Sequence, residues 1–215
     1  MLQCVGCGAG NDSERDGGTT SNTWALAAEN KGLAPFVIDS TLGPSFDVAI
    51  VDINGDGLLD LLVTNHVDNA TTHGSVSVVT VFQAPAAPTP LTTLSAWSRH
   101  DIAVGFDVRE AGPNQAAPGA ARAFGPPSLP APSKGQSLAP SSKPWVSVAG
   151  DGDQRFYVLT PHVPSDPLNW DYTRNLVWDC QGTVGRQTSI VIDSSLYLIV
   201  PCYDSGRIEA FLIEN

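Results

Sequence analysis

Residues 46–66, FDVAIVDINGDGLLDLLVTNH, decide the fold. Two apolar runs rich in Val, Leu and Ile flank a short segment of Asp, Asn and Gly, which is the pattern of two β-strands joined by a polar loop. The second run, Leu58 to Val63, is apolar apart from Asp60, so neighbours must cover both faces of its sheet. The stretch predicts a hairpin whose sheet is packed between other sheets.

The loop of this hairpin carries oxygen-bearing side chains at alternating positions. Loop positions one, three, five and nine are occupied by Asp52, Asn54, Asp56 and Asp60, and the carbonyl of Leu58 stands at position seven. Calcium takes a shell of hard oxygen ligands from loops of this kind, and the intervening glycines allow positive φ angles that turn the carboxylates inward. We therefore predict that these five residues bind one calcium ion.

Two alternatives to this site can be weighed from the sequence. An EF-hand requires a bidentate Glu at position twelve and flanking helices, whereas position twelve is Val63 within a β pattern. A metal-free Asp/Gly turn stays open, but several carboxylates crowded into one short loop repel one another without a cation. Calcium is the preferred interpretation.

The stretch resembles the FG-GAP/VCBS repeat of integrin α-type β-propellers, whose D-x-D/N-x-D-G-x-x-D loops bind calcium between the first two strands of a blade. Residues 182–211, with GTVG, ID, VPCYDSG and EAF, are similar to a degenerate copy. The resemblance covers about residues 34–214 and implies blades of four antiparallel strands and an extracellular or secretory location. GFDVREAG and NQAAPGAARAFGPP also resemble, more loosely, aldos-2-ulose dehydratase-like enzymes.

The rest of the chain divides into two regions. Residues 1–33 show no hydrophobic period and are expected to be a poorly ordered N-terminal segment, whereas residues 34–215 are expected to form the propeller region. Further strands are predicted at 36–39, 75–82 and 99–106. The Pro/Ala-rich stretch 107–143 is expected to be an insertion without regular structure.

The pattern of strand, Asp-containing loop and apolar strand recurs along the chain. It predicts hairpins in equivalent positions of successive blades at residues 47–63, 145–160 and 188–200. The elements amount to about three blades, fewer than the four to eight that close a propeller. We therefore expect an all-β, incomplete or open propeller, a segment of a larger one, in which residues 36–39 add an outer strand to the last repeat.

Composition limits the partners. The chain has 215 residues with 11 basic and 22 acidic side chains, giving a net charge of −11 that repels nucleic acid and anionic membranes. No apolar run is long enough to span a bilayer, and no secretory signal is visible at the N-terminus. Cys180 and Cys202, near predicted strand ends, form a better disulfide candidate than the local pair Cys4 and Cys7.

Three functions compete. The first is a calcium-stabilised binding or scaffold module for a protein or carbohydrate ligand, the second a carbohydrate-active lyase or isomerase, and the third a structural fragment of a larger propeller. No nucleophile elbow, phosphate loop or dinucleotide motif is present, and we predict no catalytic or cofactor-binding residue. The enzyme hypothesis gains if the dispersed His66, His100, His162 and Asp153 converge in space with the acidic loop. Exposed tryptophans lining a ligand rim compete with tryptophans packed between blades.

Overall fold

The computed structural model describes residues 36–68, 76–86, 88–91, 93, 96–109, 115–125 and 142–214. Contacts divide the chain into two units, Met1–Phe36 and Val37–Asn215, and the fold is that of the second unit. The expectation for the N-terminal segment 1–33 lies outside the described residues. In the described part, no helix is both long enough and apolar enough to cross a membrane.

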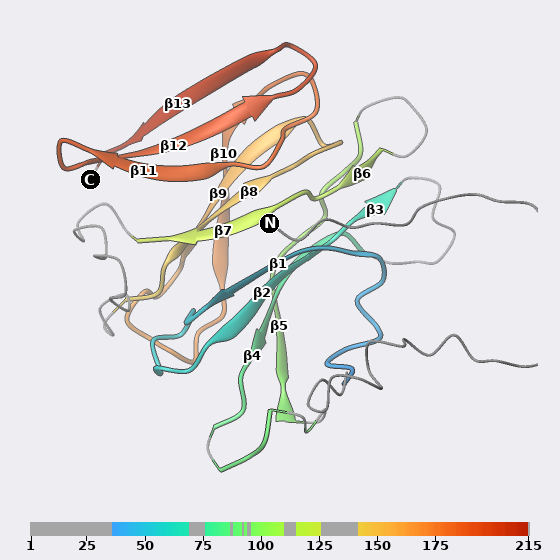
Figure 1. Cartoon of the computed structure of the whole chain (residues 1–215), viewed down its shortest axis with the longest axis vertical. Helices are drawn as coiled ribbons and strands as arrows, with labels where there is room; N and C mark the ends of the chain where they lie inside the picture. Colours follow the sequence, from blue (N-terminus) through green and yellow to red (C-terminus); the bar gives the residue numbers. More distant parts are fainter. Residues whose placement is uncertain are drawn as a thin grey trace, which may run out of the picture. The chain divides into compact units, whose positions relative to one another are not determined.

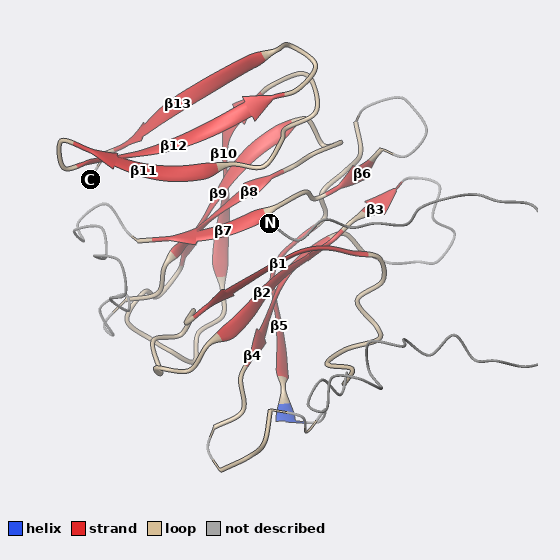
Figure 2. Ribbon diagram, viewed as in Figure 1, coloured by secondary structure: helices blue, strands red, loops and turns tan. Residues whose placement is uncertain are grey.

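Three antiparallel sheets follow one another along the chain, so the predicted all-β class is confirmed (Figures 1 and 2). The first sheet has the order β1-β2-β4-β5, with the strands β1 Ser45–Val51, β2 Asp60–Asn65, β4 Val78–Gln83 and β5 Ser98–Val104. The second runs in chain order through β7 Ala121–Phe124, β8 Trp145–Ala149, β9 Arg155–Pro161 and β10 Tyr172–Asp179. The third consists of β11 Thr188–Ile192, β12 Ser195–Cys202 and β13 Arg207–Ile213. A short ribbon pairs β3 Val67–Asp68 with β6 Ala116–Ala117.

The three predicted hairpins are present, but one is shifted within its sheet. β1 pairs with β2, β8 with β9, and β11 with β12, all antiparallel. The hairpin of residues 145–160 supplies the second and third strands of its sheet, because β7 precedes it. The prediction that all three hairpins take equivalent positions is therefore wrong for this one.

The reason is a strand inside the stretch predicted to be an unstructured insertion. Residues 121–124 contain no proline and pair fully with β8, from Ala121 opposite Val148 to Phe124 opposite Trp145. The expectation for 107–143 is wrong for residues 116–117 and 121–124, which are strands. Residues 110–114 and 126–141 of that stretch lie outside the part that the structure describes.

The strand predicted at residues 36–39 does not form. The Asp39 carboxylate accepts the backbone N–H groups of Thr41 and Leu42 at 2.8 and 2.7 Å, which bends the chain away from an extended course. Ile38 and Leu42 pack instead against Val63 and Phe82 of the first sheet. The proposed addition of residues 36–39 to the last repeat is therefore wrong, and the third sheet has three strands.

The second sheet is packed on both faces. One apolar cluster joins it to the first sheet and includes Leu62, Val81, Val148 and Leu159. A second cluster joins its other face to the third sheet and includes Phe156, Val158, Leu198 and Val200. Side chains that alternate along β8 and β9 thus enter different cores, as the two-sided apolar pattern requires.

The first and second sheets contact each other strand by strand. β1 lies against β7, the first strand of each sheet, and β5 lies against β10, the last strand of each. At the first strands, Asp47 of β1 is 7% exposed and forms ion pairs with Arg122 of β7 and with Arg186, which precedes β11. The Arg186 bond spans 3.1 Å, so the start of the third sheet also reaches β1. Side chains from β1, from β7 and from the segment just before β11 therefore meet at Asp47.

Candidate metal centre and its surroundings

The candidate site is the loop between β1 and β2, residues 52–59. Gly55 and Gly57 have φ angles of +77° and +85°, so both glycines adopt the left-handed conformations expected from the sequence. A Cβ built on Gly57 meets no atom within 4 Å, which means that backbone conformation, and not space, selects glycine there. The loop thus reverses the chain over a short distance and brings its polar side chains together.

Hydrogen bonds within the loop fix its first three candidate ligands. The Asp52 carboxylate accepts the N–H groups of Gly55 at 2.7 Å and Gly57 at 2.9 Å. The Asn54 carbonyl oxygen accepts the N–H of Asp56 at 3.1 Å, and the Asn54 amide donates to Asp56 at 2.8 Å. Asp56 also accepts the N–H of Leu58 at 2.8 Å. Each side chain therefore closes a local turn.

Asp60 connects the loop to the rest of the first sheet. Its buried carboxylate accepts the N–H of Ile53 at 3.0 Å and that of Ala84, just after β4, at 2.9 Å. Burial raises its pKa; the two backbone bonds oppose this shift, and the negative charges of Asp56 and Asp52 add to it. The carboxylates of Asp56 and Asp52 are thus close enough to Asp60 to disfavour its negative charge.

These residues fit calcium in donor chemistry, whereas their arrangement is one of hydrogen-bonded turns. Within the described residues, no group of three or more His, Cys, Asp or Glu side chains is arranged to hold a metal ion. The oxygens of Asp52, Asn54 and Asp56 face backbone N–H donors. A calcium ion at this loop would have to replace some of these donors with its own charge.

A buried lysine near the loop was not anticipated from the sequence. Lys143 is 2% exposed, its ammonium donates to the carbonyl of Asn169, and it lies 4.4 Å from the ring centroid of Trp170. Burial lowers its pKa, and the charges of Asp166, Asp171 and Asp60 oppose that shift. The chain therefore places a cation of its own within electrostatic range of Asp60.

The dispersed histidines do not meet the acidic loop. His66 follows the far end of β2, where its Nε2 lies 2.9 Å from Asp151 and its ring stacks on Phe46. β2 has six residues, which places the acidic loop about 20 Å from His66. His100 stacks on Trp170 with a centroid distance of 4.1 Å.

The contacts of the other two candidates, Asp153 and His162, lie outside the loop. Buried Asp153 accepts a 2.5 Å bond from the hydroxyl of Tyr157. The backbone N–H of His162 donates to the backbone carbonyl of Asp171 at 2.8 Å, and His162 is exposed. These contacts give the enzyme hypothesis no shared centre with the loop.

A polar groove of about 300 Å³ lies between β5 and β10, and its lining includes Asp101, Trp170, Asp171, Tyr172 and Arg174. Several of these groups are already paired. Burial, the largest single influence on the pKa of Asp101, would raise it. The hydrogen bonds from Arg99 and Thr80 together outweigh burial and lower this pKa. Arg174 donates to the carbonyls of Val104 and Gly105 and so joins the two sheets. The groove is thus mainly a sheet-to-sheet contact.

The aromatic residues are mostly packed between or upon sheets. Trp145 and Trp178 border the core between the second and third sheets, and Trp97 packs on the outer face of the first. Tyr203 differs, being 79% exposed. The tryptophans in the described part of the chain therefore contribute to sheet packing more than to a ligand rim.

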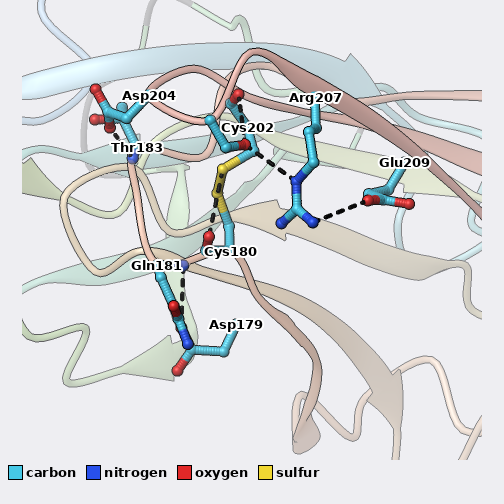
Figure 3. Close-up of a disulfide and its surroundings, with 9 residues drawn as sticks. Asp179, Cys180, Gln181, Thr183, Cys202, Asp204, Arg207 and Glu209 are labelled. Atoms are coloured by element: carbon cyan, nitrogen blue, oxygen red, sulfur yellow. Dashed lines mark hydrogen bonds and ion pairs between the residues drawn. A yellow bond between two sulfur atoms is a disulfide. The ribbon is translucent and has the colours of Figure 1, made fainter.

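The second and third sheets are joined covalently by a disulfide between Cys180 and Cys202 (Figure 3). Cys180 follows β10, Cys202 ends β12, and both are buried. The sequence had indicated this pair as the better candidate. Cys4 and Cys7 precede the first described residue.

Comparisons with protein-family models, with curated proteins and with solved structures found no match. The resemblance to FG-GAP/VCBS repeats therefore rests on the loop motif and its setting between strands.

Proposed function

We propose that this chain is a calcium-stabilised binding or scaffold module, built from three blades of an incomplete β-propeller of the FG-GAP/VCBS type. The observation that carries the proposal is the repetition of one antiparallel meander in three consecutive segments. Propeller blades are four-stranded meanders arranged radially about an axis. In this interpretation the first strands are the innermost strands, and the third blade lacks its fourth strand.

The ion pairs of Asp47 support the radial arrangement. Arg122 and Arg186 reach the same carboxylate from the first strand of the second sheet and from the segment before the third sheet. Sheets in a flat, parallel stack would keep the first and third sheets roughly 20 Å apart, because packed sheets are spaced by about 10 Å. Convergence at one edge favours blades that fan out from an axis.

Calcium is supported by the loop's donor set and by the electrostatics around Asp60. Asp56 and Asp52 both raise the pKa of buried Asp60, which is the expected sign of mutual repulsion. A divalent cation would supply positive charge at this position and offset that repulsion. The proposed ion stabilises the first blade and takes no part in chemistry.

The disulfide supports a site of action in an oxidising compartment, in agreement with the extracellular or secretory location that the resemblance implies. Disulfides persist mainly in secreted proteins and in compartments that do not reduce them. The partner is proposed to be a protein or a carbohydrate.

Thermal unfolding of the full chain with calcium and with a chelator tests the proposal. Calcium at a hundred times its dissociation constant adds about 2.7 kcal/mol to the free energy of unfolding, so chelation should lower the Tm by roughly 5–10 °C. Asp56→Ala should remove this sensitivity, because it deletes one of the proposed calcium ligands. Asp56 is exposed, so the substitution leaves the core intact. Asp107→Ala, the same change at an exposed position outside the loop, should retain it. A melting curve that chelator leaves unchanged contradicts the calcium site.

A further inference from the structure

His100 and Lys143 contact the same indole ring from different parts of the chain. The His100 ring stacks on Trp170 with a centroid distance of 4.1 Å and an angle of 8° between the rings. The Lys143 ammonium lies 4.4 Å from the centroid of the Trp170 ring and donates to the carbonyl of Asn169. An aromatic ring attracts one cation, but a second cation on the same ring is repelled by the first. The cluster therefore favours His100 in its neutral form.

This cluster joins the last strands of the first and second sheets. His100 on β5 lies opposite Val81, a residue of the core between these sheets, so its ring points toward the second sheet. Trp170 stands just before β10 and packs against the same core. Beside it, Arg174 of β10 donates to two backbone carbonyls at and after the end of β5. The stack is thus part of the contact that borders the groove between β5 and β10.

The charge that opposes protonation of His100 is that of Lys143. On the same strand, Asp101 attracts a protonated His100, but this carboxylate is already bound by Arg99 at 2.9 Å. On β4, the His100 Nε2 lies 3.3 Å from the uncharged amide of Gln83. Three carboxylates favour the charged form of Lys143: Asp60, Asp166 and Asp171. The ammonium beside the indole is therefore supported, whereas a second cation there is not.

The surroundings of His100 make the closed contact sensitive to acid. Burial lowers the pKa of His100, the charge of Lys143 lowers it further, and Asp101 opposes this shift. When the contact opens, the imidazole returns to water and regains its ordinary pKa of about 6.5. The open form therefore binds a proton at pH values where the closed form does not, and acid shifts the equilibrium toward the open form. The closed contact is most stable above about pH 6.5 and weakens as the pH falls below it.

We propose that the contact between β5 and β10 is an acid-sensitive joint, closed while His100 is neutral and opened by its protonation. Protonation adds a second cation to an indole that already holds Lys143, inside a partly buried contact. Opening separates the last strands of two sheets and exposes the polar lining of the groove, which includes Asp101, Asp171 and Arg174. Acid thus converts a sheet-to-sheet contact into an accessible polar surface.

Hydrogen exchange of the full chain, followed by NMR at about pH 7.5 and about pH 5.5, tests the joint. After correction for the intrinsic pH dependence of exchange, the opening constant of the β5 amides should rise on acidification by up to about ten-fold per pH unit. His100→Phe keeps an aromatic ring on Trp170 but cannot take up a proton, so it should reduce this rise. Amides of β12 and β13, in the third sheet, should show the same pH dependence with and without the substitution.

His162→Gln is the matched control, because His162 is exposed and lies in the connection between β9 and β10. It should retain the rise. Lys143→Met removes the ammonium and keeps an apolar side chain beside Trp170, so it should raise the midpoint of the His100 NMR titration and weaken the rise. This variant also serves if His100→Phe does not fold.

Three results overturn the proposal. The first is a His100 titration midpoint at or above that of a histidine in the unfolded chain. The second is an acid response of the β5 amides that His100→Phe and Lys143→Met both leave unchanged. The third is a response that His100→Phe removes equally from β5 and from β12 and β13, because His100 would then act on the whole fold and not on this joint.

Discussion

The second and third sheets share one sequence pattern but differ in how it is used. Both have apolar side chains pointing to either face, yet only the second sheet is covered on both. Val146, Val148, Phe156 and Leu159 of the second sheet are fully buried, whereas Ile208 of the third is 73% exposed. The third sheet is held by the core it shares with the second sheet, by the disulfide, and by the two residues before β11: Arg186 pairs with Asp47, and the buried Gln187 amide donates to the carbonyls of Ala120 and Ser147. We therefore expect stability to be unevenly distributed, with the third sheet the first to separate.

The largest expected effect comes from the core shared by both sheets. Phe156 is 0% exposed and its ring lies 5.9 Å from that of Phe211 on β13. Phe156→Ala leaves a cavity between the sheets and should lower the free energy of unfolding by about 3–5 kcal/mol, measured by urea denaturation. Leu168→Ala, at an exposed position, should change it by less than about 0.5 kcal/mol. Equal effects of the two variants would argue against a common core.

The disulfide should give the next largest effect. It closes a segment with a sequence separation of 22 residues. Cys180→Ala combined with Cys202→Ala should lower the stability by about 2–4 kcal/mol, chiefly because the unfolded chain gains freedom. Hydrogen exchange should show amides of β12 and β13 losing protection before those of β8 and β9. A uniform loss across all sheets would show that the third sheet is not a separate unit, and Cys4→Ala with Cys7→Ala serves as the control.

The ion pair at the first strands should contribute least. Arg186 is largely exposed at its side chain, 64%, so its 3.1 Å contact with Asp47 is weakened by solvent. A double-mutant cycle with Arg186→Met and Asp47→Asn should give a coupling energy of about 0.2–1 kcal/mol. Arg207→Met, which removes the 3.7 Å pair with Glu209 inside the third sheet, provides the comparison. A coupling energy of zero between Arg186 and Asp47 would show that this ion pair does not help to hold the third sheet.

Local sequence patterns predicted the local structure well. The hairpin around the acidic loop, the strands near 75–82 and 99–106, and the positive φ angles of Gly55 and Gly57 depend on alternation and on turn residues that are close in sequence. β7 was missed because Ala121–Phe124 has little pattern of its own. Its pairing is specified by β8, more than 20 residues later.

The sequence indicated the oxygen donors of the acidic loop, whose role as calcium ligands stays a prediction, but it did not indicate how the loop connects to the rest of the fold. The spacing indicated Asp60 as a ligand, yet its bond to Ala84 spans 24 residues and depends on how β4 ends. Asp47 stood in an apolar strand, which could have signalled a buried charge with a partner. Its partners Arg122 and Arg186 lie 75 and 139 residues away, and no local pattern connects them.

The separation of the two disulfide cysteines along the chain has a consequence during synthesis. Domains begin to fold from the N-terminus while the ribosome adds about 5–20 residues per second. Cys180 therefore leaves the ribosome as a free thiol roughly 1–4 seconds before Cys202, since 22 residues separate them. Within this sequence, Cys4 and Cys7 are synthesised before Cys180. The core that buries Cys180 is completed only by β12 and β13, so correct oxidation depends on the third sheet packing before Cys180 reacts with another thiol.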